Sequence, residues 1–343
     1  MSPIDRRQGL WGLTALGLAA AIVPLALRRA RAGTPAAPRG TLAVVEKGEG
    51  RVAFYRLPDG ARLGTVPLGI QPHEMVADDA GRLAYVGGYG VKGWQVAGEG
   101  GHQLWVVDLA ARRLARTIDL APHRRWHGVR MDAKGRLYAL SESDSQLARF
   151  DRPDSAGSPD RMIPVGGARS HYFVVNRDGD RAYIADTMSG MVIMVNPEDA
   201  SIAPVKQHIG QAPEGLALSP DERTLYVVDR PAGILHALDA VTLQSRARVT
   251  LRGEAVRVIV QDDGRLIVSN PADQSLTRHA PATLAEEARL PLPAAAPGLT
   301  LPAGGRTLYA ALADNRIAII DLASWRLTHS FATGDAPDTA VLL

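Results

Sequence analysis

The chain has 343 residues, no cysteine and a formal net charge of +3. The lack of cysteine excludes a disulfide scaffold, a thiolate metal site and a cysteine nucleophile. The positive charge is concentrated in residues 1–32, which carry five arginines and one acid, and the remaining residues have a net charge of −1. No basic run lies beyond this segment, so we expect no nucleic-acid partner.

Residues 1–32 have the residue order of an export signal. Arg6 and Arg7 precede an apolar stretch at residues 10–27, and small residues then flank Arg31. The paired arginines resemble a twin-arginine signal, which implies delivery of a folded protein to the periplasm. An uncleaved anchor is the alternative, because the apolar stretch is just long enough to span a bilayer. After cleavage, residues 33–40 would form a linker and the protein would leave the membrane.

A short element recurs along the rest of the chain, with an Asp/Gly turn, an arginine and an apolar strand centred on tyrosine. Its central residues, spaced 41 to 53 positions apart, are Tyr85, Tyr138, Tyr183, Tyr226, Ile267 and Tyr309. Residues 41–45 supply a seventh copy. Three further short strands accompany each copy, and a repeated four-stranded unit of this length is a propeller blade.

Residues 339–343 form one spare strand that can complete the first blade, which otherwise begins with only three strands. Such closure leaves no open sheet edge at the seam of the ring. The sequence therefore predicts an all-β, seven-bladed β-propeller over residues 41–343, with 1+3 closure.

Residues 212–239, APEGLALSPDERTLYVVDRPAGILHALD, resemble the YVTN repeat of secreted bacterial β-propellers, the YncE-like proteins. The histidine-containing segments at residues 72–75, 122–128 and 170–171 are similar to a subset of that family. The resemblance covers nearly all of residues 41–343 and implies a propeller and export, whereas a fold alone does not imply a function. The repeat is also similar to that of lactonase-like propellers, but Ala185 and Asp186 replace their usual Asn-Glu.

The phase of the repeat places one residue of each blade at the start of its innermost strand, facing the axis of the ring. Successive blades carry His73, His127, His171 and Glu214 there, and Asp338 completes the column from the C-terminal strand. Glu74 and Arg257 lie next to this column. We expect the ligand site to consist of His73, Glu74, His127, His171, Glu214 and Arg257.

A second group of polar residues follows the tyrosine strands and is expected around the same channel mouth, as partners of the axial residues. Its members are Glu46, Glu142, Asp186, Asp229 and Asn270. A glycine-rich insertion at residues 91–102 is predicted to be a lid or a partner-binding loop. Tyr89, Trp94 and Trp126 are predicted to line the entrance as aromatic platforms.

Three interpretations of the axial column remain open. Imidazoles and a carboxylate can hold a divalent metal, the one cofactor that the sequence suggests, with His73, His127, His171 and Glu214 as ligands. The same groups can exchange protons with a bound molecule, while Arg257 holds an anionic group. The third interpretation is that they only form hydrogen bonds to water in a wet channel.

We therefore expect an exported, monomeric binding protein for a small ligand, a metal or a periplasmic protein partner. The enzymatic alternative, which the sequence favours less, is a lactonase-like hydrolase or a metal-assisted lyase that uses the same mouth. A second alternative is a structural interaction platform with an inert channel.

Overall fold

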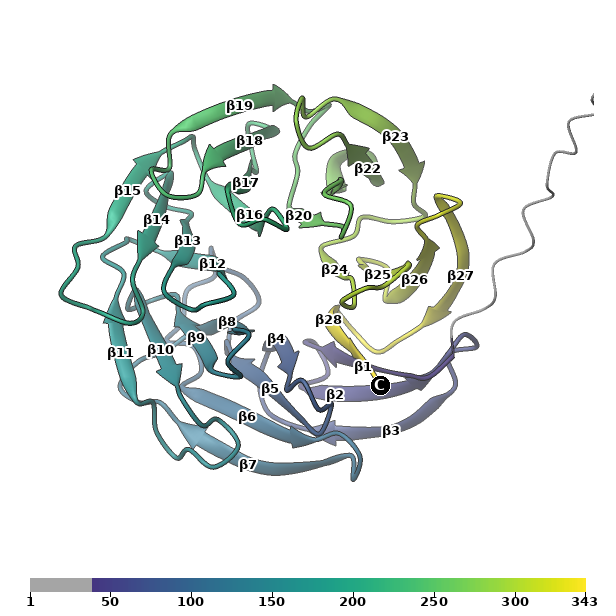
Figure 1. The fold of residues 1–343 in the computed structure, drawn as a ribbon. Helices are drawn as coiled ribbons and strands as arrows, with labels where there is room; N and C mark the ends of the chain where they lie inside the picture. Colours follow the sequence, from purple (N-terminus) through teal and green to yellow (C-terminus); the bar gives the residue numbers. More distant parts are fainter. Residues whose placement is uncertain (1–38) are drawn as a thin grey trace, which may run out of the picture. The chain divides into compact units, whose positions relative to one another are not determined.

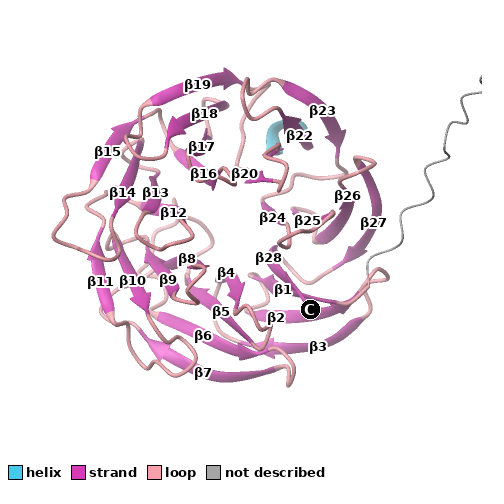
Figure 2. Ribbon diagram, viewed as in Figure 1, coloured by secondary structure: helices cyan, strands magenta, loops and turns pink. Residues whose placement is uncertain are grey.

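The computed structural model describes residues 39–343 of the chain. The predicted export signal and most of the predicted linker lie outside the described residues. Seven four-stranded antiparallel sheets follow one another around a ring (Figure 1). Strands dominate throughout, and the one helix of this part is the short 3-10 turn at Pro271–Asp273, drawn in cyan in Figure 2. The predicted all-β seven-bladed propeller is confirmed.

Each blade runs from an innermost strand at the axis to an outer strand at the rim. Blade 1 consists of β28 (Pro337–Leu342), β1 (Thr41–Glu46), β2 (Arg51–Arg56) and β3 (Arg62–Pro67). Blade 2 consists of β4 (Pro72–Ala77), β5 (Leu83–Gly88), β6 (Gln103–Asp108) and β7 (Arg113–Asp119). Blade 3 consists of β8 (Trp126–Met131), β9 (Leu137–Ser141), β10 (Gln146–Phe150) and β11 (Arg161–Pro164).

The remaining blades repeat this order. Blade 4 consists of β12 (Ser170–Val175), β13 (Ala182–Asp186), β14 (Met191–Val195) and β15 (Val205–His208). Blade 5 consists of β16 (Pro213–Leu218), β17 (Thr224–Asp229), β18 (Ile234–Asp239) and β19 (Ser245–Thr250). Blade 6 consists of β20 (Arg257–Val260), β21 (Leu266–Asn270), β22 (Ser275–His279) and β23 (Glu286–Pro291). Blade 7 consists of β24 (Gly298–Thr300), β25 (Thr307–Leu312), β26 (Arg316–Asp321) and β27 (Arg326–Ala332).

The ring closes where the last strand joins the first blade. β28 pairs antiparallel with β1, with Ala43 opposite Val341. The backbones of Thr41 and Leu343 exchange both of their hydrogen bonds. The predicted 1+3 closure is therefore confirmed, and it removes the sheet edge that β1 would otherwise expose.

The core is a set of apolar layers between neighbouring blades. The second and third strands of each blade are buried along most of their length, whereas an outer strand such as β19 is largely exposed. The tyrosines at the centre of the repeat fill these layers, and Tyr85, Tyr138 and Tyr183 are completely buried. Burial on both faces explains why the second strands are continuous apolar runs.

A β-bulge recurs at the axial end of five innermost strands. The register with the neighbouring strand shifts at the starts of β4, β8, β12, β16 and β28. A bulge leaves residues unpaired and re-aims their side chains. The residues left unpaired include His73, His127, His171, Glu214 and Asp338, so the bulges position the axial column.

Candidate functional site

Three axial histidines form a stack at one mouth of the channel. The ring centroids of His73 and His127 are 4.0 Å apart, and those of His127 and His171 are also 4.0 Å apart. Tyr89 contacts two of them edge-on, with centroid distances of 5.1 Å to His73 and 5.0 Å to His127. All four side chains are buried, and His127 is 0% exposed. Tyr89 thus seals the stack, so it is not the open platform predicted from the sequence.

A carboxylate lies at each end of the histidine stack. At one end, His73 Nδ1 is 2.8 Å from Asp338 Oδ2, but the angles between the two groups are not those of a hydrogen bond. Lys47 Nζ is 3.5 Å from the same oxygen. At the other end, His171 Nδ1 is hydrogen-bonded to Glu142 Oε2 at 2.6 Å. The stack is therefore a row of imidazoles between two acids.

The central imidazole is neutral at pH 7. Burial lowers the pKa of His127 well below its ordinary value of 6.5, and the adjacent His171 and His73 lower it further. A neutral imidazole has one N–H donor and one acceptor nitrogen. Neither nitrogen of His127 has a hydrogen-bond partner among residues 39–343. His127 therefore has an unused donor and an unused acceptor.

The two end carboxylates remain ionised. Burial alone would raise the pKa of Asp338, but the charges of Lys47 and His73 lower it far below its usual range. Burial also opposes ionisation of Glu142, but the hydrogen bonds from His171 and Tyr89 and the charges of His171 and Arg169 together outweigh it, so that the pKa of Glu142 is lowered.

Glu142 connects the stack to the insertion. It accepts hydrogen bonds from Tyr89 at 2.7 Å, from Arg169 at 3.1 Å and from Arg125 at 3.4 Å. The two arginines also donate to backbone carbonyls of residues 91–102, at 2.8 Å from Arg125 to Val96 and 2.9 Å from Arg169 to Trp94. The insertion is thus fastened to the carboxylate that holds His171.

A further group of polar side chains adjoins the histidine stack. Glu214 accepts from Arg257 at 3.0 Å and from Arg230 at 2.9 Å, and it lies 3.9 Å from His171 Nε2. Tyr172 and the ion pair between Glu74 and Arg130, at 2.6 Å, belong to the same group. We call the five residues Glu74, Arg130, Tyr172, Glu214 and Arg257 the partition, because their ion pairs and cation–π contacts join them into one continuous row between blades.

Most of the predicted second group does not contact the axial histidines. Three of its carboxylates instead accept N–H groups from the loop that enters the innermost strand of the same blade. Gly334 N–H donates to Glu46 at 2.7 Å, Arg169 N–H to Asp186 at 2.8 Å, and Ala212 N–H to Asp229 at 2.8 Å. Asn270 donates to Val268 and Thr277 within its own blade.

Glu142 differs because Ser141 takes the loop-binding role in blade 3. Ser141 Oγ donates to the carbonyl of Arg124 at 2.6 Å, in the loop before β8. Glu142 follows one residue later and is free to contact His171. The repeat pattern therefore predicted one role for the whole second group, whereas Glu142 contacts an axial histidine and the other carboxylates bind loops.

Other residues near the site were not assigned from the sequence or were assigned wrongly. Arg130 and Tyr172 were missed, because each belongs to only one blade and no repeat position marks it. Trp126 was predicted to line the entrance, but it is 0% exposed and packs between blades 2 and 3. Its indole N–H donates to the carbonyl of His123 at 3.0 Å, so its role is structural.

The described residues contain no group of three or more His, Asp or Glu side chains arranged to hold a metal ion. Neighbouring imidazoles are tilted by 37° and 47° at a centroid spacing of 4.0 Å, whereas metal ligands must converge on one point at about 2.1 Å. Metal binding by His73, His127, His171 and Glu214 stays a prediction. Elemental analysis of the purified protein tests it directly.

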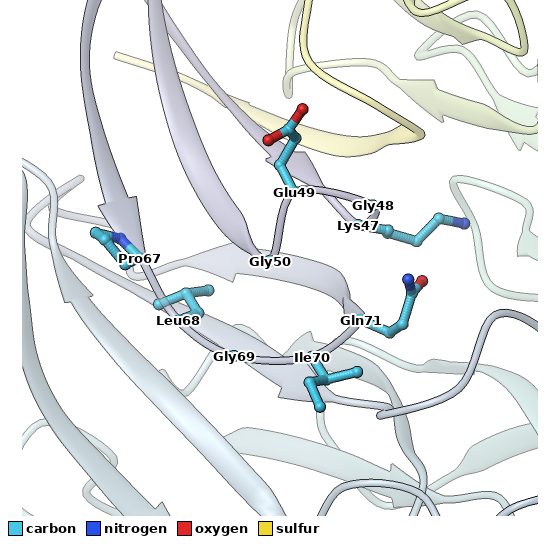
Figure 3. Close-up of a pocket in the computed structure, with 9 residues that line it drawn as sticks. All are labelled: Lys47, Gly48, Glu49, Gly50, Pro67, Leu68, Gly69, Ile70 and Gln71. Atoms are coloured by element: carbon cyan, nitrogen blue, oxygen red, sulfur yellow. The ribbon is translucent and has the colours of Figure 1, made fainter.

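An open surface pocket of about 410 Å³ adjoins the histidine mouth. The loops that follow β1 and β3 line it, and Figure 3 shows the side chains of Lys47 and Gln71 extending from them toward the same side. Because Lys47 also contacts Asp338, the pocket reaches the acidic end of the stack. Solvent thus comes close to His73 without reaching His127, which is completely buried.

Sequence comparisons relate the chain to YncE. It is 26% identical over 176 residues to the uncharacterized protein YncE of Salmonella typhimurium. The matched region covers 50% of this chain and 46% of the relative. It is 27% identical over 152 residues to YncE of Escherichia coli K12, and that matched region covers 43% of this chain and 39% of the relative. The chain thus spans less than half the length of these curated relatives. No protein-family model matches it.

Solved structures with the same fold have diverse functions. The periplasmic gluconolactonase PpgL of Pseudomonas aeruginosa has a TM-score of 0.70 at 18% identity, covering 89% of this chain and 99% of that one. A protein from Bacteroides uniformis, proposed to be a 6-phosphogluconolactonase, has a TM-score of 0.68 at 15% identity, covering 89% and 99%. Hydrazine synthase of Kuenenia stuttgartiensis has a TM-score of 0.69 at 14% identity, covering 82% and 92%. The chain is therefore a seven-bladed β-propeller, homologous to YncE over about half of its length, with lactonase-like propellers among its structural neighbours.

Proposed function

We propose that this chain is an exported binding protein for a small polyhydroxylated ligand, held at the axial histidine stack. The observation that carries the proposal is His127, whose two buried nitrogens have no partner among the described residues. Buried polar groups in folded proteins are nearly always hydrogen-bonded. A neutral imidazole offers one donor and one acceptor, and hydroxyl groups can satisfy both.

The insertion controls access to this site. His127 is sealed by Tyr89 and its two neighbouring imidazoles, so a ligand reaches it only when the cover moves. Residues 92–99 of the insertion are mostly exposed and are held through the side chains of Arg125 and Arg169. Loops with few buried contacts open at low cost in free energy, which suits this role.

Calorimetric titration of the purified protein with D-gluconate and D-glucono-1,5-lactone tests the proposal. These probes are polyhydroxylated, and they match the activities named for two structural neighbours. Saturable binding is expected, together with a loss of at least tenfold in affinity in His127→Phe. The matched control is His236→Phe, which alters a buried histidine of β18 outside the axial column. Equal binding by both variants would contradict the proposal.

One observation favours catalysis as a second candidate function. Glu142 fixes Nδ1 of His171, and Nε2 lies 3.9 Å from Glu214. An imidazole held by a carboxylate on one nitrogen is oriented as a general base on the other. Lactone hydrolysis, followed by acid release at constant pH, is then expected to stop in His171→Gln. Binding of the lactone without turnover would leave only the binding function.

A further inference from the structure

The channel has a second cavity on the side of the partition away from the histidines. Its volume is about 330 Å³, near the lower end of the range for small-molecule sites. Later residues of the innermost strands form it, and its walls are mostly apolar. They include Met75, Val76, Val129, Ile259, Leu299 and Leu301.

Part of the cavity lining is polar and comes from one buried and one partly exposed side chain. Tyr172 and Arg130 both line it. The guanidinium carbons of Arg130 and Arg257 each lie 4.8 Å from the centre of the Tyr172 ring. These cation–π contacts fix the aromatic ring and the two guanidiniums relative to one another.

Arg130 has donors left to offer a ligand. Only its Nη1 is engaged, by Glu74 at 2.6 Å and by the carbonyl of Val129 at 2.7 Å. Its Nε and Nη2 have no carboxylate or carbonyl partner within residues 39–343, and the side chain is 22% exposed. A planar guanidinium edge of this kind matches the two oxygens of a carboxylate.

The rim of the cavity restricts what else the ligand can carry. Asp262 lies there and is exposed, while the walls between it and Arg130 are apolar. A second anionic group on the ligand would meet the Asp262 charge or would have to enter the apolar wall, and both are unfavourable. The site therefore selects against dicarboxylates.

We propose that this cavity binds a small monocarboxylate with an apolar body. The carboxylate accepts hydrogen bonds from Nε and Nη2 of Arg130, and the body lies against Ile259 and Leu299. This site and the histidine site lie on opposite sides of the partition, so the inference does not depend on the function proposed above.

Titration of the full chain with hexanoate, adipate and methyl hexanoate tests the inference. Hexanoate is expected to bind saturably, and adipate and methyl hexanoate at least fivefold more weakly. In the double variant Arg130→Gln/Glu74→Gln, which keeps the partition neutral, hexanoate affinity should fall at least tenfold. His127→Phe should bind hexanoate as the parent does, which separates this site from the histidine site.

A second variant keeps the test decisive where the double variant fails to fold. Ile259→Trp fills the cavity and leaves the ion pair between Arg130 and Glu74 intact, so hexanoate affinity should again fall at least tenfold. Absence of saturable hexanoate binding to the folded parent, or unchanged affinity in folded Ile259→Trp, would overturn the inference.

Discussion

At the scale of single residues, the buried neutral His127 makes stability depend on pH. Its folded-state pKa is lowered by burial and by the flanking His171 and His73, with Arg257 and Lys47 adding to the effect. Below pH 6.5 the unfolded chain binds a proton that the folded state excludes, so stability falls as the pH decreases. One such proton costs about 1.4 kcal/mol per pH unit.

We predict that His127→Phe reduces this loss of stability between pH 7.5 and pH 5.5. The remaining loss comes from His73, His236 and His279, whose pKa values are also lowered by burial, and from carboxylates that begin to protonate. Urea denaturation of the parent and the variant at the two pH values measures the loss of stability. His208→Gln, at an exposed position on β15, should retain the parental dependence on pH. A variant slope equal to the parental one would contradict the assignment.

Loss of the Glu142 carboxylate should strongly reduce the stability of the fold. It pairs with Arg125 and Arg169 and holds His171, and its own side chain is 0% exposed. Glu142→Gln leaves two guanidiniums without a counter-charge, and breaking a buried pair of this kind costs about 3–5 kcal/mol. The matched control is Glu49→Gln, since Glu49 contacts Arg51 from a surface position that is 41% exposed. Chemical denaturation should show a change below about 0.5 kcal/mol for the control.

At the scale of elements, the insertion is the part of the propeller that can change without loss of the fold. Replacing residues 92–99 with two glycines should preserve the melting temperature within a few degrees, because no β-ladder includes them. It should also loosen the cover of the histidine stack, because Arg125 and Arg169 lose the carbonyls of Val96 and Trp94, so that diethyl pyrocarbonate modifies His127 faster. Shortening residues 154–158, a loop between β10 and β11, provides the control. Equal reactivity of His127 in both variants would show that the insertion does not cover the stack.

The innermost strands show which elements could be predicted from the sequence. A repeat with constant phase predicts where each strand begins, and the structure places His73, His127 and His171 side by side at those positions. Their 4.0 Å spacing depends on bulges, which leave no trace in the repeat period. Glu74, Glu214 and Arg257 of the partition were among the predicted site residues, but the contacts of the partition were not predicted. Arg130 and Tyr172 meet through side chains of different blades, and no spacing within one blade encodes that contact.

At the scale of the whole molecule, the ring was predictable because the repeat and its closure are properties of chain order. Four strands per repeat and one spare strand at the C-terminal end permit one arrangement without an open edge, and that arrangement is observed. The candidate site depends instead on positions where blades differ from one another. Glu142 is an example, since it departs by one residue from the position that Asp186 and Asp229 occupy in their blades.

Closure of the ring predicts that stability depends strongly on β28. Removal of residues 337–343 exposes the edge of β1 and deletes Asp338, which leaves His73 and Lys47 without their carboxylate. Removal of residues 342–343 alone keeps most of the ladder, because Ala43 and Val44 still pair with the shortened strand. We expect the longer truncation to aggregate or to melt at least 15 °C lower, and the shorter one to lose only a few degrees in melting temperature. Each kcal/mol of lost unfolding free energy lowers the melting temperature by about 2–4 °C in a domain of 150–250 residues, and by less in a larger one. Calorimetry of both truncations measures this, and similar melting temperatures for the two would show that β28 does not close the ring in solution.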